Sequence, residues 1–285
     1  MEKLIIALQK SGRLQEDSLK LLKECGFNVD YRSGQLKIEV ADFPAELLFL
    51  RNSDIPQYIE DGVVDIGIVG SNLLEEDEKN VDIVQKLNFS KCRVSFAVPK
   101  NSTIQIPADL EGKRIATSYP NTVKKFLQKE GISAEIHTIS GSVEIAPSID
   151  LADAIADIVS TGNTLFQNGL REVYPFLYSE AVLVKSSKLS AEKSELLDQL
   201  LFRIKSVLAA KENKYILLNA PKEQLDNICS ILPGMKSPTI LPLAIEGWVS
   251  VHSVIKNSDS WRIVQELKNA GAQGILVCPI EKMVS

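Results

Sequence analysis

The sequence predicts an α/β protein with two α/β lobes and a smaller C-terminal module. At 285 residues, the chain is longer than the roughly 250 residues at which a single core stops growing. Short apolar runs alternate with amphipathic segments as far as about residue 185, which is typical of strands separated by helices and favours mostly parallel sheets. After a long segment with one apolar face, at 190–213, the order of elements changes.

The elements before residue 190 have ordinary start and stop signals. Gly26 and Gly131 stand where two helices should end, and Pro56 and Asn121 stand near two helix starts. The expected helices are 14–26, 53–62 and 121–131. The expected strands are 3–8, 36–40, 46–51, 63–70, 92–100, 112–119, 134–140 and 181–185.

The C-terminal segment reads β-α-β-β-α-β, the ferredoxin-like arrangement. A module of about 70 residues can fold around its own core. Its elements are a strand at 214–220, a helix at 221–232, strands at 237–244 and 247–255, a helix at 258–271 and a strand at 273–280. We therefore expect a first lobe of 1–90 with 178–211, a second lobe of 91–177 and a third domain of 212–285.

Composition excludes several functional classes. The net charge of -5 argues against nucleic-acid and membrane-surface binding, because phosphate backbones and anionic lipids recruit an excess of Lys and Arg. The apolar run Leu4 to Leu8 is too short for a signal peptide, and no segment approaches the ~20 apolar residues of a membrane span, so we expect a cytoplasmic protein.

The cysteines and histidines do not indicate a metal or triad site. The four cysteines have no C-x-x-C pair and no histidine at ligand spacing, so we expect buried free thiols; they are Cys25, Cys92, Cys229 and Cys278. The two histidines, His137 and His252, lie far apart in strand-like segments, and we expect partly buried strand residues rather than ligands.

The stretch "DIVSTGNTLFQNG", residues 157–169, has the groups that a phosphomonoester requires. Ser160, Thr161 and Thr164 carry hydroxyl donors, and Gly162 permits close approach of the backbone. A helix from about Thr164 would direct its unpaired N–H groups at an anion. The alternative is ordinary capping and turn chemistry, which uses the same residue types.

Two carboxylates upstream of this turn narrow the expected ligand. Asp153 and Asp157 would repel a bare phosphate, but a carboxylate accepts hydrogen bonds from ribose hydroxyls. The combination therefore favours a ribose 5-phosphate. The alternative is that one or both aspartates cap or solvate a helix end.

Six segments together resemble the ATP phosphoribosyltransferase family, the first enzyme of histidine biosynthesis, over essentially the whole chain. They are "ALQKSGRL", "DGVVDIGIVGSNLLEE", "GKRIATSYP", "GSVEIAPSIDLADAIADIVSTGNTLFQNGLREV", "SPTILPLA" and "GILVCPIEKM". The resemblance implies a two-lobed catalytic unit similar to type II periplasmic binding proteins, followed by a ferredoxin-like regulatory domain as in the long form of the family. One departure is Ser71, where many relatives carry an acidic or larger polar residue; we assign it no role.

The resemblance implies that N1 of ATP attacks C1 of 5-phosphoribosyl 1-diphosphate and that pyrophosphate leaves. Mg²⁺ would be held mainly through substrate phosphates, so no protein metal ligand is assigned. Lys10 and Arg13 would face the substrate cleft between the two lobes; the alternative is that they are solvated cations at the start of a helix. Glu144 and Tyr119 lie on segments that match motifs of the family. The implied binding residues for the phosphoribosyl group are Asp153, Ala154, Asp157, Ser160, Thr161, Gly162, Asn163 and Thr164.

For the C-terminal module, the resemblance implies feedback inhibition by L-histidine bound between neighbouring regulatory domains. Asn219, Thr239 and Gly274 are the candidates, with ordinary strand and turn chemistry as the alternative. It also implies homo-oligomers, from dimer to hexamer. Two other classes stay open: a solute-binding protein of the same two-lobed fold, and a non-catalytic relative that acts as an allosteric partner.

Overall fold

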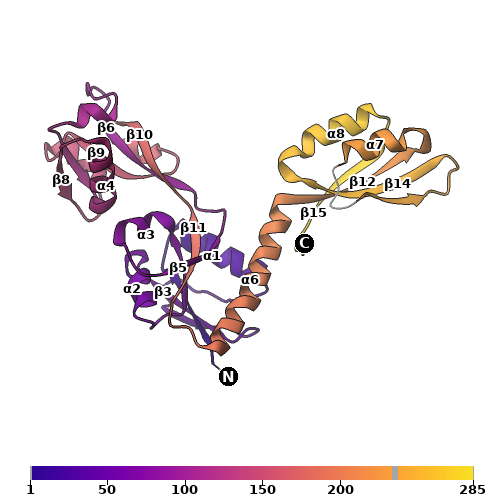
Figure 1. The fold of residues 1–285 in the computed structure, drawn as a ribbon, viewed down its shortest axis with the longest axis horizontal. Coiled ribbons are helices and arrows are strands. Elements are labelled where there is room, and N and C mark those ends of the chain that lie inside the picture. Colours follow the sequence, from indigo (N-terminus) through magenta and orange to yellow (C-terminus); the bar gives the residue numbers. More distant parts are fainter. Residues whose placement is uncertain (1, 233–236, 285) are drawn as a thin grey trace. The chain divides into compact units, whose positions relative to one another are not determined.

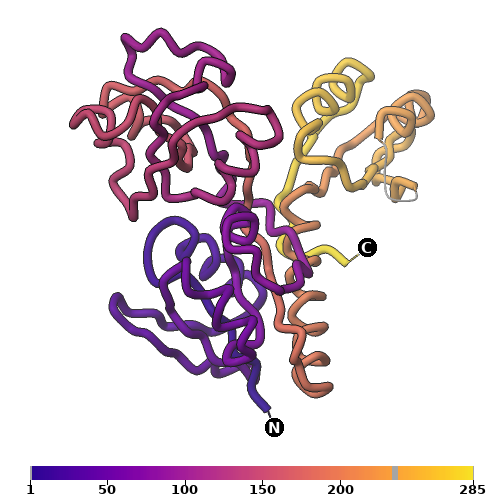
Figure 2. The backbone as a smooth tube through the Cα atoms, turned by 60° about the vertical axis from the view of Figure 1, so that its left-hand side comes forward, coloured from indigo at the N-terminus to yellow at the C-terminus, as the bar shows by residue number. Residues whose placement is uncertain are grey.

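A computed structural model describes residues 2–232 and 237–284 (Figure 1). The chain divides into two compact units. The first contains the residues up to Lys20 together with Phe27–Leu197, and the second contains Leu21–Gly26 together with the residues from Asp198 onwards. The first unit holds two sheets, which appear as separate bodies of the backbone trace in Figure 2.

The first sheet has six strands in the order β2-β3-β1-β4-β11-β5. Its strands are β1 (Leu4–Gln9), β2 (Lys37–Glu39), β3 (Ala45–Leu50), β4 (Ile66–Gly70), β5 (Asp82–Lys86) and β11 (Ala181–Lys185). Its helices are α1 (Arg13–Glu24), α2 (Ile55–Glu60), α3 (Ser71–Asp77) and the 3-10 turn η1 (Asn52–Asp54). We call this sheet with its helices the first lobe.

The second sheet has five strands in the order β10-β6-β9-β7-β8. They are β6 (Cys92–Pro99), β7 (Arg114–Thr117), β8 (Glu135–Thr138), β9 (Ala154–Val159) and β10 (Leu170–Ser179). Its helical elements are η2 (Pro107–Leu110), α4 (Pro120–Glu130), η3 (Val143–Ile149) and α5 (Asn163–Gln167). We call this sheet with its helices the second lobe.

The expectation of mostly parallel sheets is wrong. In the first lobe only the β1–β3 and β1–β4 pairs are parallel, and in the second lobe only the β7–β8 and β7–β9 pairs. Most of the antiparallel pairs involve the strands that flank the two passages of the chain between the sheets: β11 pairs antiparallel with β4 and β5, and β6 pairs antiparallel with β9 and β10. The pair of neighbouring strands β2 and β3 is also antiparallel. Apolar runs alone do not reveal strand direction.

The second lobe has a buried core on each face of its sheet. On one face Val123 and Leu127 of α4 pack against Phe96 of β6. On the other face Val143 of η3 and Leu165 of α5 pack against the sheet. The short helical elements around the predicted phosphate turn are therefore anchored by apolar side chains.

The second unit contains the ferredoxin-like sheet, with strand order β13-β14-β12-β15. Its elements are α6 (Ala191–Glu212), which begins in the first unit, β12 (Asn213–Pro221), η4 (Lys222–Gln224), α7 (Leu225–Ile231), β13 (Thr239–Pro242), β14 (Trp248–Lys256), η5 (Asn257–Asp259), α8 (Ser260–Asn269) and β15 (Gln273–Pro279). Ile228 of α7 and Ile263 of α8 pack on Ile216 and Val251 of the sheet, which confirms the β-α-β-β-α-β prediction.

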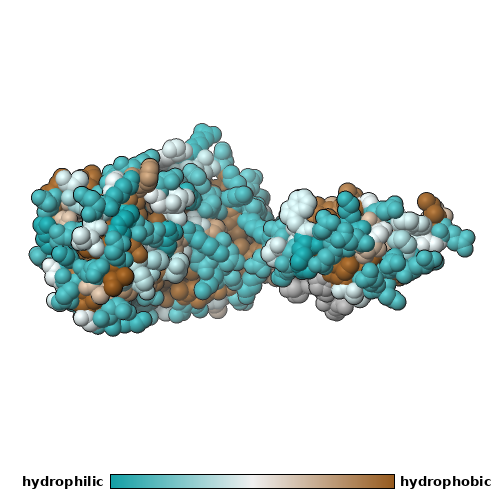
Figure 3. Space-filling view, turned by 90° about the horizontal axis from the view of Figure 1, so that it is seen from above, coloured by the Kyte–Doolittle hydropathy of each residue, from teal (hydrophilic) through white to brown (hydrophobic). Residues whose placement is uncertain are grey.

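The surface is mixed in character. Figure 3 shows hydrophilic residues over most of the visible face, with small hydrophobic patches between them, an ordinary pattern for a folded chain. Among the helices of residues 2–232 and 237–284, none has the length and hydropathy needed to cross a bilayer. All four cysteines are free, but only Cys25 is buried and the other three are partly exposed, so the expectation of buried thiols holds for one of them.

Candidate active site

The predicted phosphate turn directly follows β9 and opens α5. Gly162 is the N-cap of α5 with φ +81°, a left-handed conformation that glycine adopts without strain. The hydroxyls of Ser160, Thr161 and Thr164 belong to exposed residues. The predicted helix is present but has only five residues, Asn163–Gln167, so the donors here are a few backbone N–H groups and the hydroxyls.

This turn borders a polar cavity of about 230 Å³, which we call the turn cavity. It is lined by Ser160, Thr161, Gly162 and Thr164 of the turn, by Ile158, Val159 and Leu165, and by the carboxylates of Asp157 and Glu144. Burial raises the pKa of Asp157 above its usual range, and the nearby charge of Glu144 adds to the shift. The structure thus brings together two carboxylates and three hydroxyls that lie up to 20 positions apart in the chain.

Asp153 is the predicted residue that the structure separates from the turn. It precedes β9, so the six residues of the strand, at ~3.3 Å each, separate it from the turn by roughly 20 Å. Its carboxylate instead accepts hydrogen bonds from Arg114 Nε, Nη2 and the backbone N–H at 3.3, 3.0 and 2.9 Å. Arg114 thereby lowers the pKa of Asp153. Ala154, the first residue of β9, is fully buried and presents no surface to a ligand.

No lysine or arginine lines the turn cavity. Arg93 is a cation that contacts the turn: its Nη1 donates to the carbonyl of Ser160 at 3.2 Å. Its Nε and Nη2 donate to Glu172 Oε1 and Oε2 at 2.6 and 2.5 Å. Because this guanidinium is already paired, it supports the turn rather than offering an open anion site.

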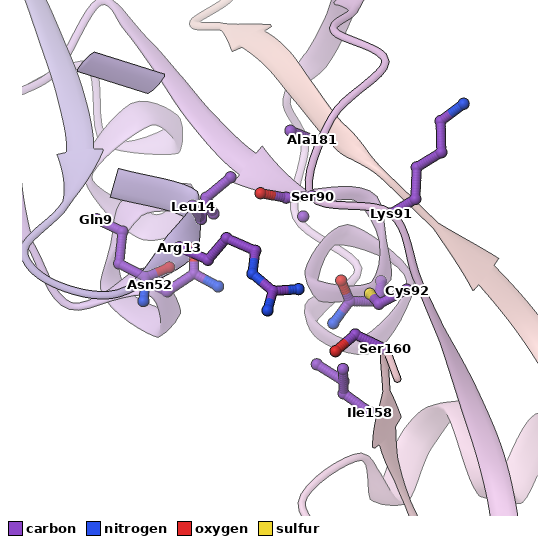
Figure 4. Close-up of a pocket in the computed structure, with 12 residues that line it drawn as sticks. Gln9, Arg13, Leu14, Asn52, Ser90, Lys91, Cys92, Ile158, Ser160 and Ala181 are labelled. Atoms are coloured by element: carbon purple, nitrogen blue, oxygen red, sulfur yellow. The ribbon is translucent and has the colours of Figure 1, made fainter. Parts of the chain in front are cut away.

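A second cavity of about 340 Å³ adjoins the first, and we call it the central cavity. Ser160 and Ile158 line both cavities. Figure 4 shows the guanidinium of Arg13 projecting into it from the start of α1, with Gln9 and Asn52 beside it and Ser160 across from it. The first and second lobes therefore both contribute to this cavity.

Lys10 does not share the position of Arg13. It lies outside the lining of both cavities, its side chain is exposed, and its backbone is engaged by Leu50 and Tyr31. Of the two cations predicted to face the cleft, the structure brings only Arg13 to it.

Sequence reasoning missed several polar residues of the central cavity. They are Gln9, Asn52, Asn72, Ser90, Lys91 and Cys92. Three of them follow or end strands: Gln9 ends β1, Asn52 follows β3 and Asn72 follows β4. Since α/β proteins bind ligands beyond the carboxyl ends of strands, that position was the available signal.

Ser71 and Asn72 form a buried hydrogen-bond network with Ser179 at the junction of β10 and β11. Ser179 Oγ donates to Asn72 Oδ1 at 2.8 Å and accepts from Asn72 N at 3.0 Å, while Ser71 Oγ donates to Ser179 Oγ at 3.1 Å. Ser71, to which the sequence assigned no role, therefore ties α3 to one of the two passages between the lobes.

Tyr119 lies beside the same network, immediately before α4. Burial, together with the charge of Asp157, raises the pKa of its phenol, and the side chain of Asn72 offsets a small part of that rise. Tyr119 is therefore a neutral residue behind the cavity wall at ordinary pH.

In the second unit, the structure brings together two of the three predicted regulatory residues. Gly274 lies in an irregularity of β15 opposite β12, and a side chain there would begin 3.4 Å from Asn219 Nδ2. Thr239 lies on β13, on the far side of β14 from Asn219. Between them is His252, unassigned from the sequence, whose Nδ1 and Nε2 lie 2.7 and 2.9 Å from the hydroxyls of Tyr215 and Ser250.

The two adjoining cavities suit a ligand with distinct parts. The turn cavity offers hydroxyl and backbone donors for a phosphate and carboxylates for sugar hydroxyls, and the central cavity offers a guanidinium for further negative charge. Within the part of the chain that the structure describes, no three His, Cys, Asp or Glu side chains gather closely enough to hold a metal ion.

Comparison with known proteins gives two family matches along the chain. The profile of the family described as ATP phosphoribosyltransferase matches residues 51–206, and the profile described as HisG, C-terminal domain, matches residues 210–282. The chain is 54% identical over 279 residues to an ATP phosphoribosyltransferase of Cytophaga hutchinsonii, covering 98% of each chain. It is 52% identical over 279 residues to one of Parabacteroides distasonis, covering 98% of this chain and 99% of that one.

Solved structures agree with the predicted fold class. A chain of the ATP phosphoribosyl transferase (HisG:HisZ) complex from Thermotoga maritima superposes with a TM-score of 0.59 at 30% identity, covering 71% of this chain and 98% of that chain. A substrate binding protein of an amino acid ABC transporter superposes with a TM-score of 0.51 at 13% identity, covering 73% of this chain and 93% of that one. The second likeness concerns the fold alone, and it confirms the two-lobed, periplasmic-binding-protein-like architecture.

Proposed function

The chain belongs to the ATP phosphoribosyltransferase family, and on that premise we propose how its residues carry out the family's reaction. ATP and 5-phosphoribosyl 1-diphosphate condense to N1-(5-phosphoribosyl)-ATP and pyrophosphate, the first step of histidine biosynthesis. The observation that supports our assignment most is the pair of adjoining cavities that share Ser160. One cavity suits the sugar phosphate and the other suits the groups that must meet it.

The 5-phosphate is assigned to the turn from Ser160 to Thr164. Its hydroxyls and the first N–H groups of α5 are donors. Gly162 has no side chain, so a phosphate can approach the backbone closely there. The absence of cations from this lining is compatible with phosphate binding, because a cradle of backbone N–H groups supplies positive electrostatic potential.

The ribose hydroxyls are assigned to Asp157, with Glu144 beside it, and no longer to Asp153. Both carboxylates line the turn cavity, and each can accept hydrogen bonds from hydroxyl donors. Burial raises the pKa of Asp157 in the free protein, although the backbone N–H of Ile158 already donates to its Oδ1 at 2.7 Å. Hydrogen bonds from two ribose O–H donors would further stabilise its charged form.

Arg13 is assigned to the polyanion in the central cavity, either the diphosphate or the triphosphate of ATP. As N1 of adenine bonds to C1, the bond from C1 to the diphosphate breaks and its electron pair leaves with pyrophosphate. The transition state has oxocarbenium character, so the contributions of the protein are alignment of the two substrates and stabilisation of the departing charge. A guanidinium across from Ser160 is placed for the second task.

Mg²⁺ is the proposed cofactor, held mainly by substrate phosphate oxygens and water. The described residues contain no dedicated three-ligand cluster, which suits an ion that prefers to keep its waters and bind through phosphates. When bound, it would neutralise part of the charge on the pyrophosphate. Asp157 and Glu144 are the nearest carboxylates it could meet in the turn cavity.

We assign regulation to residues 212–285, with L-histidine as the feedback inhibitor, and we propose a homo-oligomer, dimer to hexamer, in the cytoplasm. Asn219 and Gly274 form the better-supported part of the histidine site, because they adjoin each other. Thr239 would join them only across β14. Such a coupling between sites is typically ~1 to 3 kcal/mol.

The non-catalytic relative is the second candidate, since the solved Thermotoga maritima chain belongs to a complex named HisG:HisZ. Purified protein alone, mixed with ATP, 5-phosphoribosyl 1-diphosphate and Mg²⁺, should form phosphoribosyl-ATP, followed by absorbance. A folded protein that turns over only when a second protein is added would support the partner-dependent alternative and contradict ours.

The turn assignment is tested by Thr161→Ala combined with Thr164→Ala. Binding of 5-phosphoribosyl 1-diphosphate should weaken far more than binding of ATP, measured by calorimetry. Thr103→Ala, an exposed threonine of the same lobe, is the matched control and should change neither affinity. Equal losses for both substrates would refute the assignment.

A further inference from the structure

We propose that Glu76 is a positioning residue for the reaction: its carboxylate fixes the first lobe to the start of α4 and so sets the separation of Arg13 and Ser160. This inference rests on the proposed function, because it assumes that both lobes hold substrate. It concerns a side chain that lies outside the lining of both cavities.

Glu76 is a buried carboxylate with an unusual set of partners. It is only 6% exposed, and it accepts hydrogen bonds from the backbone N–H groups of Asn121 and Thr122 at 2.9 and 2.8 Å and from Thr122 Oγ1 at 2.8 Å. A carboxylate in this position is favoured by the positive end of the helix dipole. We call this set of contacts the Glu76 clamp.

The Glu76 clamp joins elements that belong to different cores. Leu73 of α3 packs in the first lobe with Val69 and Val182, whereas Val123 of α4 packs in the second lobe. Tyr119, the N-cap residue of α4, makes no side-chain capping bond. The capping acceptor for α4 therefore comes from the other lobe, and its first-turn amides are not open to a ligand.

One end of α3 lies at the central cavity, and its other end holds the start of α4. At its start, Asn72 lines the central cavity and bonds to Ser179. At its end, the Glu76 clamp holds the first turn of α4, directly after Tyr119. Because α3 also carries Asn72 of the central-cavity lining, a shift of α4 relative to α3 would displace that part of the wall from the second lobe.

The consequence for catalysis follows from the division of the site between the lobes. Arg13 comes from the first lobe and Ser160 from the second, so their alignment depends on contacts that hold the lobes together. A misplacement of about 1 Å can lower a rate ~100-fold. A ligand held by the turn alone, such as ribose 5-phosphate, needs no such alignment.

Glu76→Gln in the full-length protein tests the proposal. The amide keeps the shape but presents N–H groups to one of the two backbone donors, so we expect kcat to fall at least ten-fold while the affinity for ribose 5-phosphate stays within two-fold. Hydrogen exchange at the amides of Asn121 and Thr122 should become faster. Thr122→Val removes one of the three bonds while keeping the side-chain shape, and should lower kcat by a smaller factor.

Glu78→Gln is the matched control, because Glu78 on the same segment pairs with Lys125 of α4 at 2.6 Å but both side chains are at least half exposed. It should leave kcat within two-fold. The proposal is overturned if Glu76→Gln and Thr122→Val keep wild-type kcat, or if kcat and ribose 5-phosphate affinity fall together. If the unmodified protein neither binds ribose 5-phosphate nor turns over, the proposed function fails instead. In that case the Glu76 clamp would still be supported if the amides of Asn121 and Thr122 exchange slowly in the unmodified protein and faster in Glu76→Gln.

Discussion

Asp153 and Asp157 should respond in opposite ways to the same substitution, to asparagine. Asp157 lines the turn cavity, and a hydrogen bond to a charged group contributes about 1.5 to 3 kcal/mol. Losing one such bond to a ribose hydroxyl corresponds to a fall of about 10- to 150-fold in kcat/KM for 5-phosphoribosyl 1-diphosphate. Asp153→Asn should leave kcat/KM within two-fold, because Asp153 lies at the other end of β9 and bonds to Arg114.

The free energy of unfolding should fall for Asp153→Asn, the variant that keeps its activity. Arg114 lowers the pKa of Asp153, so the stability contributed by this carboxylate is present above its unfolded pKa of about 3.9 and is lost as the pH falls through the lower folded value. Both side chains of the pair are more than a third exposed, so solvent screening limits the cost of Asp153→Asn to roughly 1 kcal/mol. That corresponds to about 2 to 4 °C in melting temperature.

For Asp157 the dependence of stability on pH has the opposite sign. Its pKa is raised by burial, so its contribution to stability is fully present below the unfolded pKa and is lost as the pH rises through the folded value. Replacing it with a neutral amide removes that loss. Asp157→Asn should therefore melt at or above the wild-type temperature at pH 8, and the difference should vanish below about pH 4.

Steady-state kinetics and thermal unfolding from pH 3 to pH 8 measure both effects on the same two variants. The reasoning is refuted if Asp153→Asn loses activity as strongly as Asp157→Asn does, or if Asp157→Asn destabilises the free protein at pH 8 while Asp153→Asn does not. The kinetic result would favour Asp153 as a ribose ligand, and the unfolding result would contradict the effect of burial on Asp157.

Three further outcomes are expected. Gly162→Ala meets no atom within 4 Å but must adopt φ +81°, so it should lower the melting temperature through a strain of about 1 to 2 kcal/mol and raise KM for 5-phosphoribosyl 1-diphosphate. Arg13→Ala should lower kcat/KM at least ten-fold whereas Lys10→Ala should change it less than three-fold, because only Arg13 lines the central cavity; equal kinetic losses would contradict this. Burial raises the pKa of Cys25 to about 12, so Cys25 should resist iodoacetamide at pH 8 until the protein unfolds, and mass spectrometry of the peptides would detect early labelling.

Much of the secondary structure follows from local sequence patterns. The apolar runs, the glycines that end helices at Gly26 and Gly131, and the element order after residue 212 all act over a few neighbouring residues, so they predict where strands and helices lie. The turn that we propose as the phosphate site was predictable for the same reason, since Ser160, Thr161 and Gly162 are adjacent. Their chemistry does not depend on what lies across the cavity.

Strand direction and the partners of each side chain depend on contacts between distant segments, and only the tertiary structure decides them. Asp153 and Asp157 carry the same carboxylate, yet β9 places one beside Arg114 and the other beside the turn. Glu76 reads as one acid in an exposed-looking run, "EEDE", until folding brings it to the first turn of α4. The sequence by itself predicted most of the strands and helices and the family resemblance, because these depend on residues near one another in the chain, but it did not predict α3, β5 or β10. The structure decided which carboxylate lies beside the turn and which contacts join the lobes, because both depend on which chain-distant groups share one small volume.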